Sequence, residues 1–310
     1  MNGVMLQGRN SMPSEFRTFL RELGILAPDA LISDGRIHRC GVVGHERSKS
    51  GAYQIFPDLF GGGGENWTTG SKWQKWTSRE RDRLTPDERA KMAALIADLS
   101  HKRAAERAAQ AIAAAKKAAT MWKAAKETRH PYLDRKGICS AGTRVLGKLL
   151  LIPVRDADGT LRSLQMVAAD GTKRFLRGGD VSGCFTWLRI GEASEPRIYV
   201  CEGLATGTTI HAAMKCAPVA VAFSCGNLLP VARLLRQRYP RGRFTICADN
   251  DHRTDGNPGV RHATAAARDI RARIAVPMGM DGTDFNDLMT ERGLDWVAEQ
   301  LRAAKIPTEA

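Results

Sequence analysis

The sequence RFTICADND, residues 243–251, carries the pattern that decides the fold. Its first six residues form a short, mostly apolar run with the Phe, Thr and Ile that are typical of strands, and Asp249 and Asp251 follow directly. A run of this length, ended by polar residues, predicts a buried strand. Three further runs of this kind lie on either side of it: Arg197–Cys201, Pro218–Phe223 and Arg273–Pro277.

Helical patterns alternate with these four predicted strands. We expect helices at Leu204–Met214, Leu228–Arg238 and Val260–Ile270. Strands that alternate with helices in this way are typical of a parallel sheet, because each helix carries the chain back to the edge where the next strand begins. The sequence therefore predicts an α/β fold for residues 196–310, with a largely parallel sheet and helices on both faces.

Acidic residues follow three of the predicted strands. Glu202 follows the first strand, Asp249 and Asp251 follow the third, and Asp284 comes after the fourth. Ligand sites of parallel sheets form beyond the carboxyl ends of the strands. Two carboxylates about 4 Å apart repel each other by roughly 4 kcal/mol at an effective dielectric constant of 20, so a cluster of them indicates a bound cation. Oxygen ligands alone favour Mg²⁺ or Mn²⁺.

Each of these acids also has a simpler interpretation. An acidic residue after a strand is often the N-cap of the next helix, and Asp284 could cap a helix that begins near Asn286. Glu202 alone would be unremarkable. Acidic residues at all three strand ends, one of them an Asp-x-Asp pair, favour the metal-site interpretation over three independent caps.

This ordered set resembles the Toprim domain that primases and topoisomerases share. Glu202-Gly203 follows one strand, Asp249-Asn250-Asp251 follows a later one, and the acidic segment Asp284–Asp287 comes last. More narrowly, the chain resembles the Toprim primases of plasmids and phages over roughly residues 128–290. Further segments support that likeness: His130–Leu133, Lys136-Gly137, Leu151–Asp156, Gly171–Leu176 and Asn257–Gly259.

The resemblance implies a role for each residue of the candidate site. Glu202 would serve in general acid/base work and in metal binding. Asp249 and Asp251 would hold Mg²⁺ or Mn²⁺, with Asp284 as a further contributor. By the same resemblance, three basic residues would contact the nucleotide and the DNA template: Arg155, Lys173 and Arg174.

The activity implied by the resemblance is Mg²⁺-dependent synthesis of primers on single-stranded DNA for a plasmid, a phage or an integrated element. Nucleoside triphosphates would be the substrates, and a separate helicase would be the partner. Two alternatives stay open: a Toprim nuclease that hydrolyses phosphodiesters, and a DNA-binding accessory protein without catalysis. A topoisomerase is disfavoured, because it needs a nucleophilic tyrosine within a much larger DNA gate, and this chain has 310 residues and four tyrosines.

The rest of the chain divides by composition into three predicted segments. Residues 1–77 read as a small N-terminal module in which the four glycines 61–64 form a turn, and residues 78–127 as a helical linker. Thr85-Pro86 is a helix-start signature, so we expect a long Ala-rich helix from there to about Glu127, or two helices with a break near Ser100. Residues 128–195 read as a small basic α+β subdomain that precedes the Toprim domain.

Composition limits the partners and the cofactors. Lys and Arg outnumber Asp and Glu by 47 to 33, a net charge of +14, which favours a polyanion as partner. None of the seven cysteines forms a Cys-x-x-Cys pair, and His38, Cys40 and His45 lack a second cysteine pair, so we expect no structural zinc. Without a leader or a run of about 20 apolar residues, we expect a cytoplasmic protein with no membrane partner.

Overall fold

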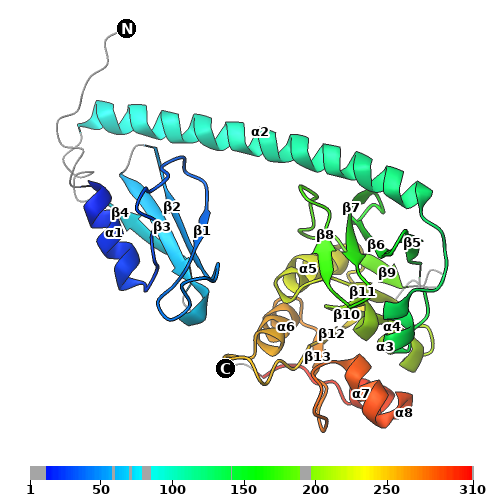
Figure 1. Ribbon diagram of the computed structural model, residues 1–310. Coiled ribbons are helices and arrows are strands. Elements are labelled where there is room, and N and C mark those ends of the chain that lie inside the picture. The colour runs from blue at the N-terminus through cyan, green and yellow to red at the C-terminus, as the bar shows by residue number, and fades with distance from the viewer. Residues whose placement is uncertain are drawn as a thin grey trace. The chain divides into compact units, whose positions relative to one another are not determined.

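The computed structural model describes residues 12–57, 60–69, 72–78, 85–140, 142–188 and 197–308. The chain divides between Ala105 and Glu106 into two compact units (Figure 1). Among the described residues, no helix combines the length and the apolar character that a membrane span requires.

The first unit contains a helix packed on an antiparallel sheet with the strand order β1-β2-β3-β4. The helix is α1 (Met12–Glu22), and its Phe16 and Leu20 are fully buried against Tyr53 and Ile55 of the sheet. The strands are β1 (His38–Cys40), β2 (Gly51–Ile55), β3 (Gly61–Asn66) and β4 (Gln74–Thr77), with a short 3₁₀ turn η1 (Trp67–Thr69) after β3.

The prediction of a turn at the four glycines was wrong, because residues 61–64 form most of β3. A Cβ on Gly62 would lie 2.5 Å from the Gln54 carbonyl oxygen, and a Cβ on Gly64 would lie 2.9 Å from the Leu20 side chain. The absence of side chains therefore lets α1 pack directly on the backbone of β3. Glycine usually weakens a strand, but it is also found where another element approaches the backbone closely.

One unbroken helix, α2 (Pro86–Ala124), follows the first sheet along the chain. Its start agrees with the predicted Pro86, and the alternative of a break near Ser100 was wrong. In the second unit, Ala114 and Ala118 of α2 are buried against an antiparallel sheet with the order β5-β6-β7-β8. That sheet consists of β5 (Arg144–Leu146), β6 (Leu149–Arg155), β7 (Leu161–Val167) and β8 (Lys173–Phe175), and the short helix α3 (Pro131–Lys136) precedes it.

The C-terminal part of the second unit contains a five-stranded sheet with the order β13-β12-β10-β11-β9. Its strands are β9 (Thr186–Leu188), β10 (Arg197–Cys201), β11 (Val219–Val221), β12 (Arg243–Cys247) and β13 (Arg273–Ala275). The last four are parallel, which confirms the prediction of a largely parallel sheet. The antiparallel edge strand β9 lies before residue 196, where we placed the start of this domain.

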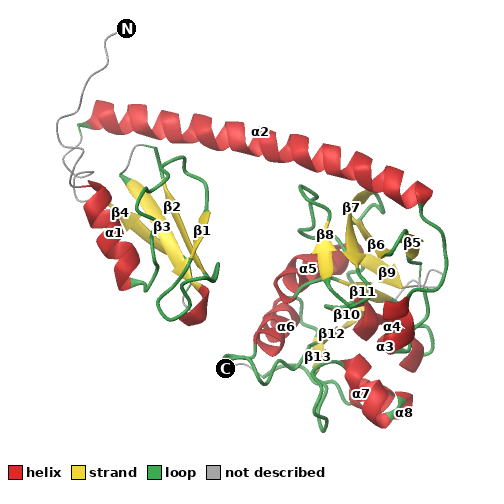
Figure 2. Ribbon diagram, viewed as in Figure 1, coloured by secondary structure: helices red, strands yellow, loops and turns green. Residues whose placement is uncertain are grey.

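Helices cover both faces of this sheet (Figure 2). Alternate residues of β10 supply the two cores: Tyr199 and Cys201 face one side, and Ile198 and Val200 face the other. The first side packs against α4 (Leu204–Ala213), α7 (Phe285–Arg292) and α8 (Leu294–Arg302), and the second packs against α5 (Leu228–Arg238) and α6 (Pro258–Asp269).

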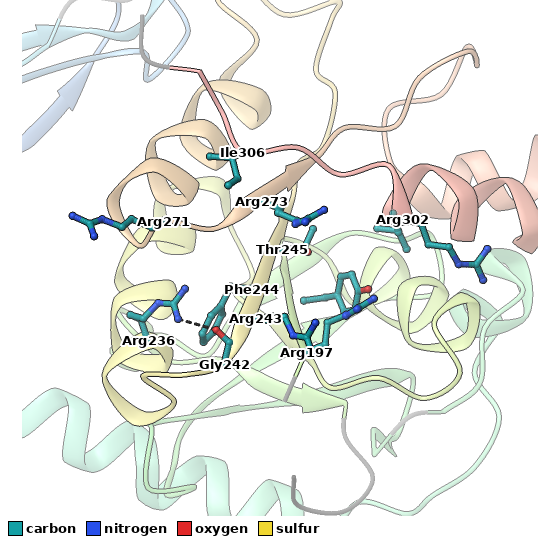
Figure 3. Close-up of a pocket in the computed structure, with 12 residues that line it drawn as sticks. Arg197, Arg236, Gly242, Arg243, Phe244, Thr245, Arg271, Arg273, Arg302 and Ile306 are labelled. Atoms are coloured by element: carbon teal, nitrogen blue, oxygen red, sulfur yellow. Dashed lines mark hydrogen bonds between the residues drawn. The ribbon is translucent and has the colours of Figure 1, made fainter. Parts of the chain in front are cut away.

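The two ends of the parallel strands differ in charge. Their carboxyl ends carry the predicted acidic residues. Their amino ends carry arginines, and these line a cavity of about 330 Å³ together with residues of α5 and α8 (Figure 3).

Candidate active site

Three of the four predicted carboxylates line one cavity of about 360 Å³ beyond the carboxyl ends of the parallel strands. Glu202 follows β10, Asp249 follows β12, and Asp284 lies in the segment after β13. Because β10, β12 and β13 are neighbours in the sheet and run in the same direction, their following residues meet at one edge. The lysines of this cavity, Lys136 and Lys173, lie on α3 and β8.

Glu202 is a half-buried carboxyl whose pKa lies above its ordinary value. Burial is the main cause, and the negative charge of Asp251 adds to it. Lys173 and a hydrogen bond from the Cys225 backbone N–H act in the opposite direction. A carboxyl with a raised pKa accepts a proton more readily, which suits a group that must take up and release protons during a reaction.

Asp249 is the most strongly perturbed carboxyl of the cavity. Burial, followed by the charges of Glu202, Asp284 and Asp251, raises its pKa to about 8. Its Oδ1 atom is buried and has no hydrogen-bond partner among the described residues. A buried oxygen without a partner costs free energy unless a cation or a donor meets it. The environment of Asp249 therefore fits a bound divalent cation.

Asp251 fixes the segment that carries Asp249. Its Oδ2 atom accepts a hydrogen bond of 2.9 Å from the Gly259 N–H at the start of α6. Gly259 is needed there, because a Cβ would lie 2.2 Å from the Asp249 carbonyl oxygen. Asn250, between the two acids, accepts a hydrogen bond from Asn257 and donates one to the Pro277 carbonyl, at 2.8 and 3.1 Å. This network holds the Asp-Asn-Asp segment against the loop that leads to Asp284.

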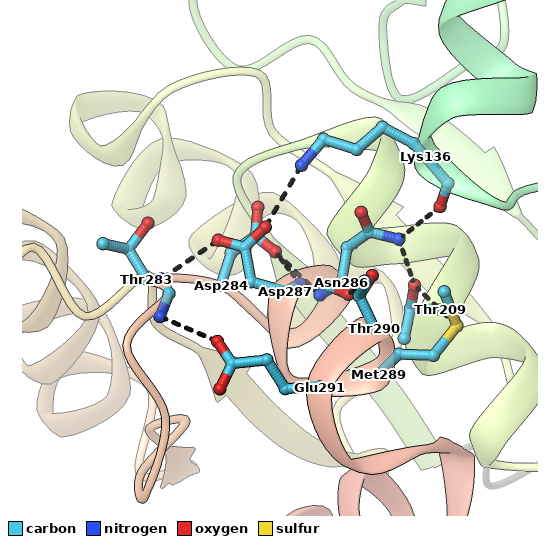
Figure 4. Close-up of polar contacts among 10 residues, drawn as sticks. Lys136, Thr209, Thr283, Asp284, Asn286, Asp287, Met289, Thr290 and Glu291 are labelled. Atoms are coloured by element: carbon cyan, nitrogen blue, oxygen red, sulfur yellow. Dashed lines mark hydrogen bonds and ion pairs between the residues drawn. The ribbon is translucent and has the colours of Figure 1, made fainter.

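Asp284 caps α7 and also lines the cavity. Its Oδ1 atom accepts hydrogen bonds from the Asn286 and Asp287 backbone N–H groups, at 2.7 and 2.9 Å (Figure 4). The helix-cap interpretation of Asp284 is thus confirmed, but it does not exclude a second role, since the residue also lies on the cavity wall.

These carboxylates do not form a ready-made chelate. Among the residues that the structure describes, no three His, Cys, Asp or Glu side chains lie close enough together to hold one metal ion. Asp251, moreover, is directed to Gly259 and is not part of the cavity wall. The donor set contains only carboxylate oxygens, which suits Mg²⁺ or Mn²⁺. Which of these acids coordinate the ion stays a prediction.

The structure places the three predicted basic residues differently. Lys173 lines the cavity, and its charge lowers the pKa of both Glu202 and Asp249. Arg174 follows it on β8 and therefore lies on the opposite face of that strand. Arg155 donates a 2.8 Å hydrogen bond to the Gly159 carbonyl in its own turn and does not line the cavity. The roles of Arg155 and Arg174 stay predictions.

Several cavity residues were not among the predicted site residues. Lys136 and Tyr132 come from α3, whose sequence we quoted only as support for the resemblance. Phe223 has a left-handed backbone conformation (φ 71°), which is strained for a bulky residue, and its ring packs edge-on against Phe175. The Lys136-Gly137 motif was a signal for α3, whereas nothing in the sequence around Phe223 indicates its conformation.

A family comparison agrees with this geometry. Residues 197–295 match the Toprim domain family. Residues 197–295 therefore form a Toprim domain, which confirms the resemblance inferred from the acidic motifs of this part of the chain.

Two relatives among characterised proteins are named as primases. The chain is 33% identical over 284 residues to the DNA primase TraC of Escherichia coli, a match that covers 86% of this chain and 26% of TraC. A second Escherichia coli protein of that name is 32% identical over 157 residues, which is 48% of this chain and 11% of the relative. The chain thus spans about a quarter, or less, of the length of these relatives.

Solved structures of primases are similar at a greater distance. The primase fragment of the bacteriophage T7 primase-helicase protein is 19% identical with a TM-score of 0.43, covering 56% of this chain and 73% of that one. The RNA polymerase domain of the Mycobacterium tuberculosis primase DnaG is 16% identical with a TM-score of 0.37, covering 58% and 64%.

Proposed function

We propose that this protein is a DNA primase that joins ribonucleotides on a single-stranded DNA template in a Mg²⁺-dependent reaction. The observation that carries the proposal is the cavity in which Glu202, Asp249 and Asp284 lie together with Lys136 and Lys173. Carboxylates can hold a divalent ion, and lysines can bind phosphates, so one cavity contains both requirements of nucleotidyl transfer. The sequence relationship to the DNA primase TraC supports the same activity.

Each cavity residue has a role in this proposal. Asp249 and Asp284, with Asp251 nearby, would hold Mg²⁺, and the ion would supply charge stabilisation for the transferred phosphoryl group. Glu202 accepts the proton of the attacking 3′-hydroxyl, whose oxygen bonds to the α-phosphorus while the bond to the departing pyrophosphate breaks. The raised pKa of Glu202 supports the proton-accepting role.

The basic residues bind the substrates. Lys136 and Lys173 line the cavity and neutralise the triphosphate, since an ammonium group serves as a point charge for phosphate oxygens. Arg155 and Arg174, which lie outside the cavity, contact the template on its way to the site. The net charge of +14 supports a polyanionic template.

The setting we propose is replication of a plasmid, a phage or another mobile element, with a separate helicase that exposes the template. The name of TraC, a DNA primase, supports a role in replication, and the name of the bacteriophage T7 primase-helicase protein shows that priming and helicase activity are coupled in a phage.

Incubation with single-stranded DNA, labelled ribonucleotides and Mg²⁺ tests the proposal. We expect template-dependent oligonucleotides from the native chain, and their loss in Glu202→Gln and in Asp249→Asn. The exposed Lys148→Gln is a control that should retain activity. Shortening of the DNA without added nucleotides would instead support a Toprim nuclease. DNA binding that survives in both acidic-site variants, with no product from any form, would support an accessory protein.

A further inference from the structure

A second charged cavity lies at the amino ends of the parallel strands, at the opposite edge of the sheet from the carboxylates. It has a volume of about 330 Å³ and contains six arginines from three adjacent strands, two helices and a turn (Figure 3). Residues within its wall such as Phe244 and Tyr199 are buried. The arginines are Arg197, Arg236, Arg243, Arg271, Arg273 and Arg302.

The register of the sheet places like charges directly beside each other. Arg197 of β10 is the Cα partner of Arg243 of β12, and Arg273 of β13 is the partner of Thr245, two residues further along β12. Like charges on facing positions of neighbouring strands destabilise a sheet. In the part of the chain that the structure describes, none of the six arginines forms an ion pair with a carboxylate. Their repulsion is therefore left without a counter-charge from those residues.

The arginines divide into a bound group and a group available to a ligand. Arg236 donates to the carbonyls of Pro240, Gly242 and Ile270, and Arg273 donates to the Ala304 carbonyl. By contrast, the guanidinium groups of Arg243, Arg271 and Arg302 form no hydrogen bond with any described residue, and all three residues are exposed. Arg236 and Arg273 thus build the wall, while Arg243, Arg271 and Arg302 keep free donors.

We propose that this arginine cavity binds the phosphodiester backbone of single-stranded DNA. Guanidinium groups bind phosphate through two parallel hydrogen bonds, and each phosphate neutralised releases condensed counterions. The arginines lie on three strands and on α5 and α8. A ligand with several successive phosphates could contact more of them than a single small anion could. Figure 3 shows Arg197, Arg243 and Arg273 between Arg271 on one side of the cavity and Arg302 on the other, so that the charges are spread across it.

The site lies beyond the proposed catalytic residues and does not depend on them. A five-residue strand such as β10 is on the order of 15 Å long, which separates the arginine cavity from the carboxylates at the other edge. The cavity would therefore hold DNA away from the reacting atoms. Within a primase, it would be a second contact for the template strand.

Binding of a fluorescein-labelled 20-nucleotide oligo(dT) in EDTA, followed by anisotropy, tests this proposal without any metal-dependent chemistry. The test variant is Arg243→Gln/Arg271→Gln. Its control is Arg233→Gln/Lys148→Gln, which removes the same charge from exposed residues outside the cavity, Arg233 being paired with Asp269 at 2.5 Å. We expect the test variant to bind at least tenfold more weakly than the native chain, and the control less than threefold.

Salt dependence supplies a second readout that a folding defect would not mimic. For single strands, each lost phosphate contact reduces the slope of log K against log salt concentration by roughly 0.7, so the test variant should lose about 1.4. Equal weakening in both variants, or none in either, would overturn the proposal. So would loss of ATP or pyrophosphate binding in the test variant with unchanged oligo(dT) binding, because the cavity would then serve a free polyphosphate. Since EDTA excludes catalysis, neither result depends on whether primer synthesis succeeds.

Discussion

The Lys136 ammonium group lies 3.2 Å from Asp287 Oδ1, and this ion pair joins α3 to α7 across 151 positions of the sequence (Figure 4). Asn286 strengthens the junction, because its amide donates to the Lys136 carbonyl at 2.9 Å and to Thr209 Oγ1 at 3.1 Å. Burial lowers the pKa of Lys136, but Asp284 and Asp287 outweigh it and hold the pKa above its ordinary value. Lys136 therefore stays charged at neutral pH, beside the residue that caps α7.

Replacing Lys136 should impair substrate binding more than folding. We expect Lys136→Met to raise the KM for nucleotides about tenfold, because a cation that faces the triphosphate is lost and a tenfold change corresponds to about 1.4 kcal/mol. Steady-state kinetics of primer synthesis measure this effect. Lys136→Arg keeps the charge and should recover part of the affinity. An unchanged KM in Lys136→Met would show that this lysine serves only to join α3 and α7.

The bounds of strands in the Toprim domain could be predicted from sequence, because buried parallel strands are short apolar runs followed by polar residues. β10 and β12 begin at the predicted Arg197 and Arg243. The edge strand β9 was missed, since three residues of an edge strand carry little pattern. Lys136 was also missed as a site residue, because its place in the cavity depends on contacts between segments far apart in the chain.

The direction of each side chain was the main feature of the site that could not be predicted from sequence. The sequence places Lys173 and Arg174 together as basic neighbours, but alternation along β8 directs only the first toward the carboxylates. In the same way, Asp249 and Asp251 look equivalent in an Asp-x-Asp pair. Only the structure reveals that Asp251 accepts a hydrogen bond from Gly259, while Asp249 keeps a buried oxygen that no described residue meets with a hydrogen bond.

The close approach of α6 to the Asp-Asn-Asp segment predicts that Gly259 cannot be replaced. In Gly259→Ala the new Cβ would lie 2.2 Å from the Asp249 carbonyl oxygen and 2.9 Å from Asp251 Oδ2, so the segment must shift. Overpacking of this kind costs roughly 1–3 kcal/mol. We expect lower thermal stability and a large loss of Mg²⁺ affinity, measured by calorimetry. Gly226→Ala is the matched control, because its Cβ would meet no atom of a described residue within 4 Å. Equal Mg²⁺ affinities in the two variants would contradict this account.

Removal of the Tyr132 hydroxyl should make the protein more stable and less active. It is buried and has no hydrogen-bond partner in the part of the chain that the structure describes, yet the residue lines the cavity. A buried polar group without a partner costs roughly 1–3 kcal/mol, so Tyr132→Phe should raise the melting temperature. The same change should lower kcat/KM for primer synthesis roughly three- to tenfold, as expected for one lost hydrogen bond to the substrate. A variant that is more stable and fully active would mean that the hydroxyl never meets a ligand.

The raised pKa of Asp249 predicts how the stability of the metal-free protein depends on pH. In the folded protein this carboxyl has a pKa of about 8, against an ordinary value of 3.8 when unfolded. Between these values the folded state binds one more proton than the unfolded state, so the free energy of unfolding falls as the pH rises from about 4 to about 8 and then levels off. Asp249→Asn cannot ionise, so in EDTA its melting temperature should exceed that of the native chain at pH 8 and match it near pH 4.

Mg²⁺ should reverse that order. The ion binds the ionised form of Asp249, so millimolar Mg²⁺ should stabilise the native chain at pH 8, while Asp249→Asn should respond weakly. Melting curves at pH 4 and pH 8, with EDTA or with Mg²⁺, give the four values needed for each protein. Asp255→Asn, which changes an exposed acid outside the cavity, controls for the general effect of removing a negative charge. If Asp249→Asn and Asp255→Asn respond alike to pH and to Mg²⁺, then Asp249 is an ordinary carboxylate, and the ion binds elsewhere.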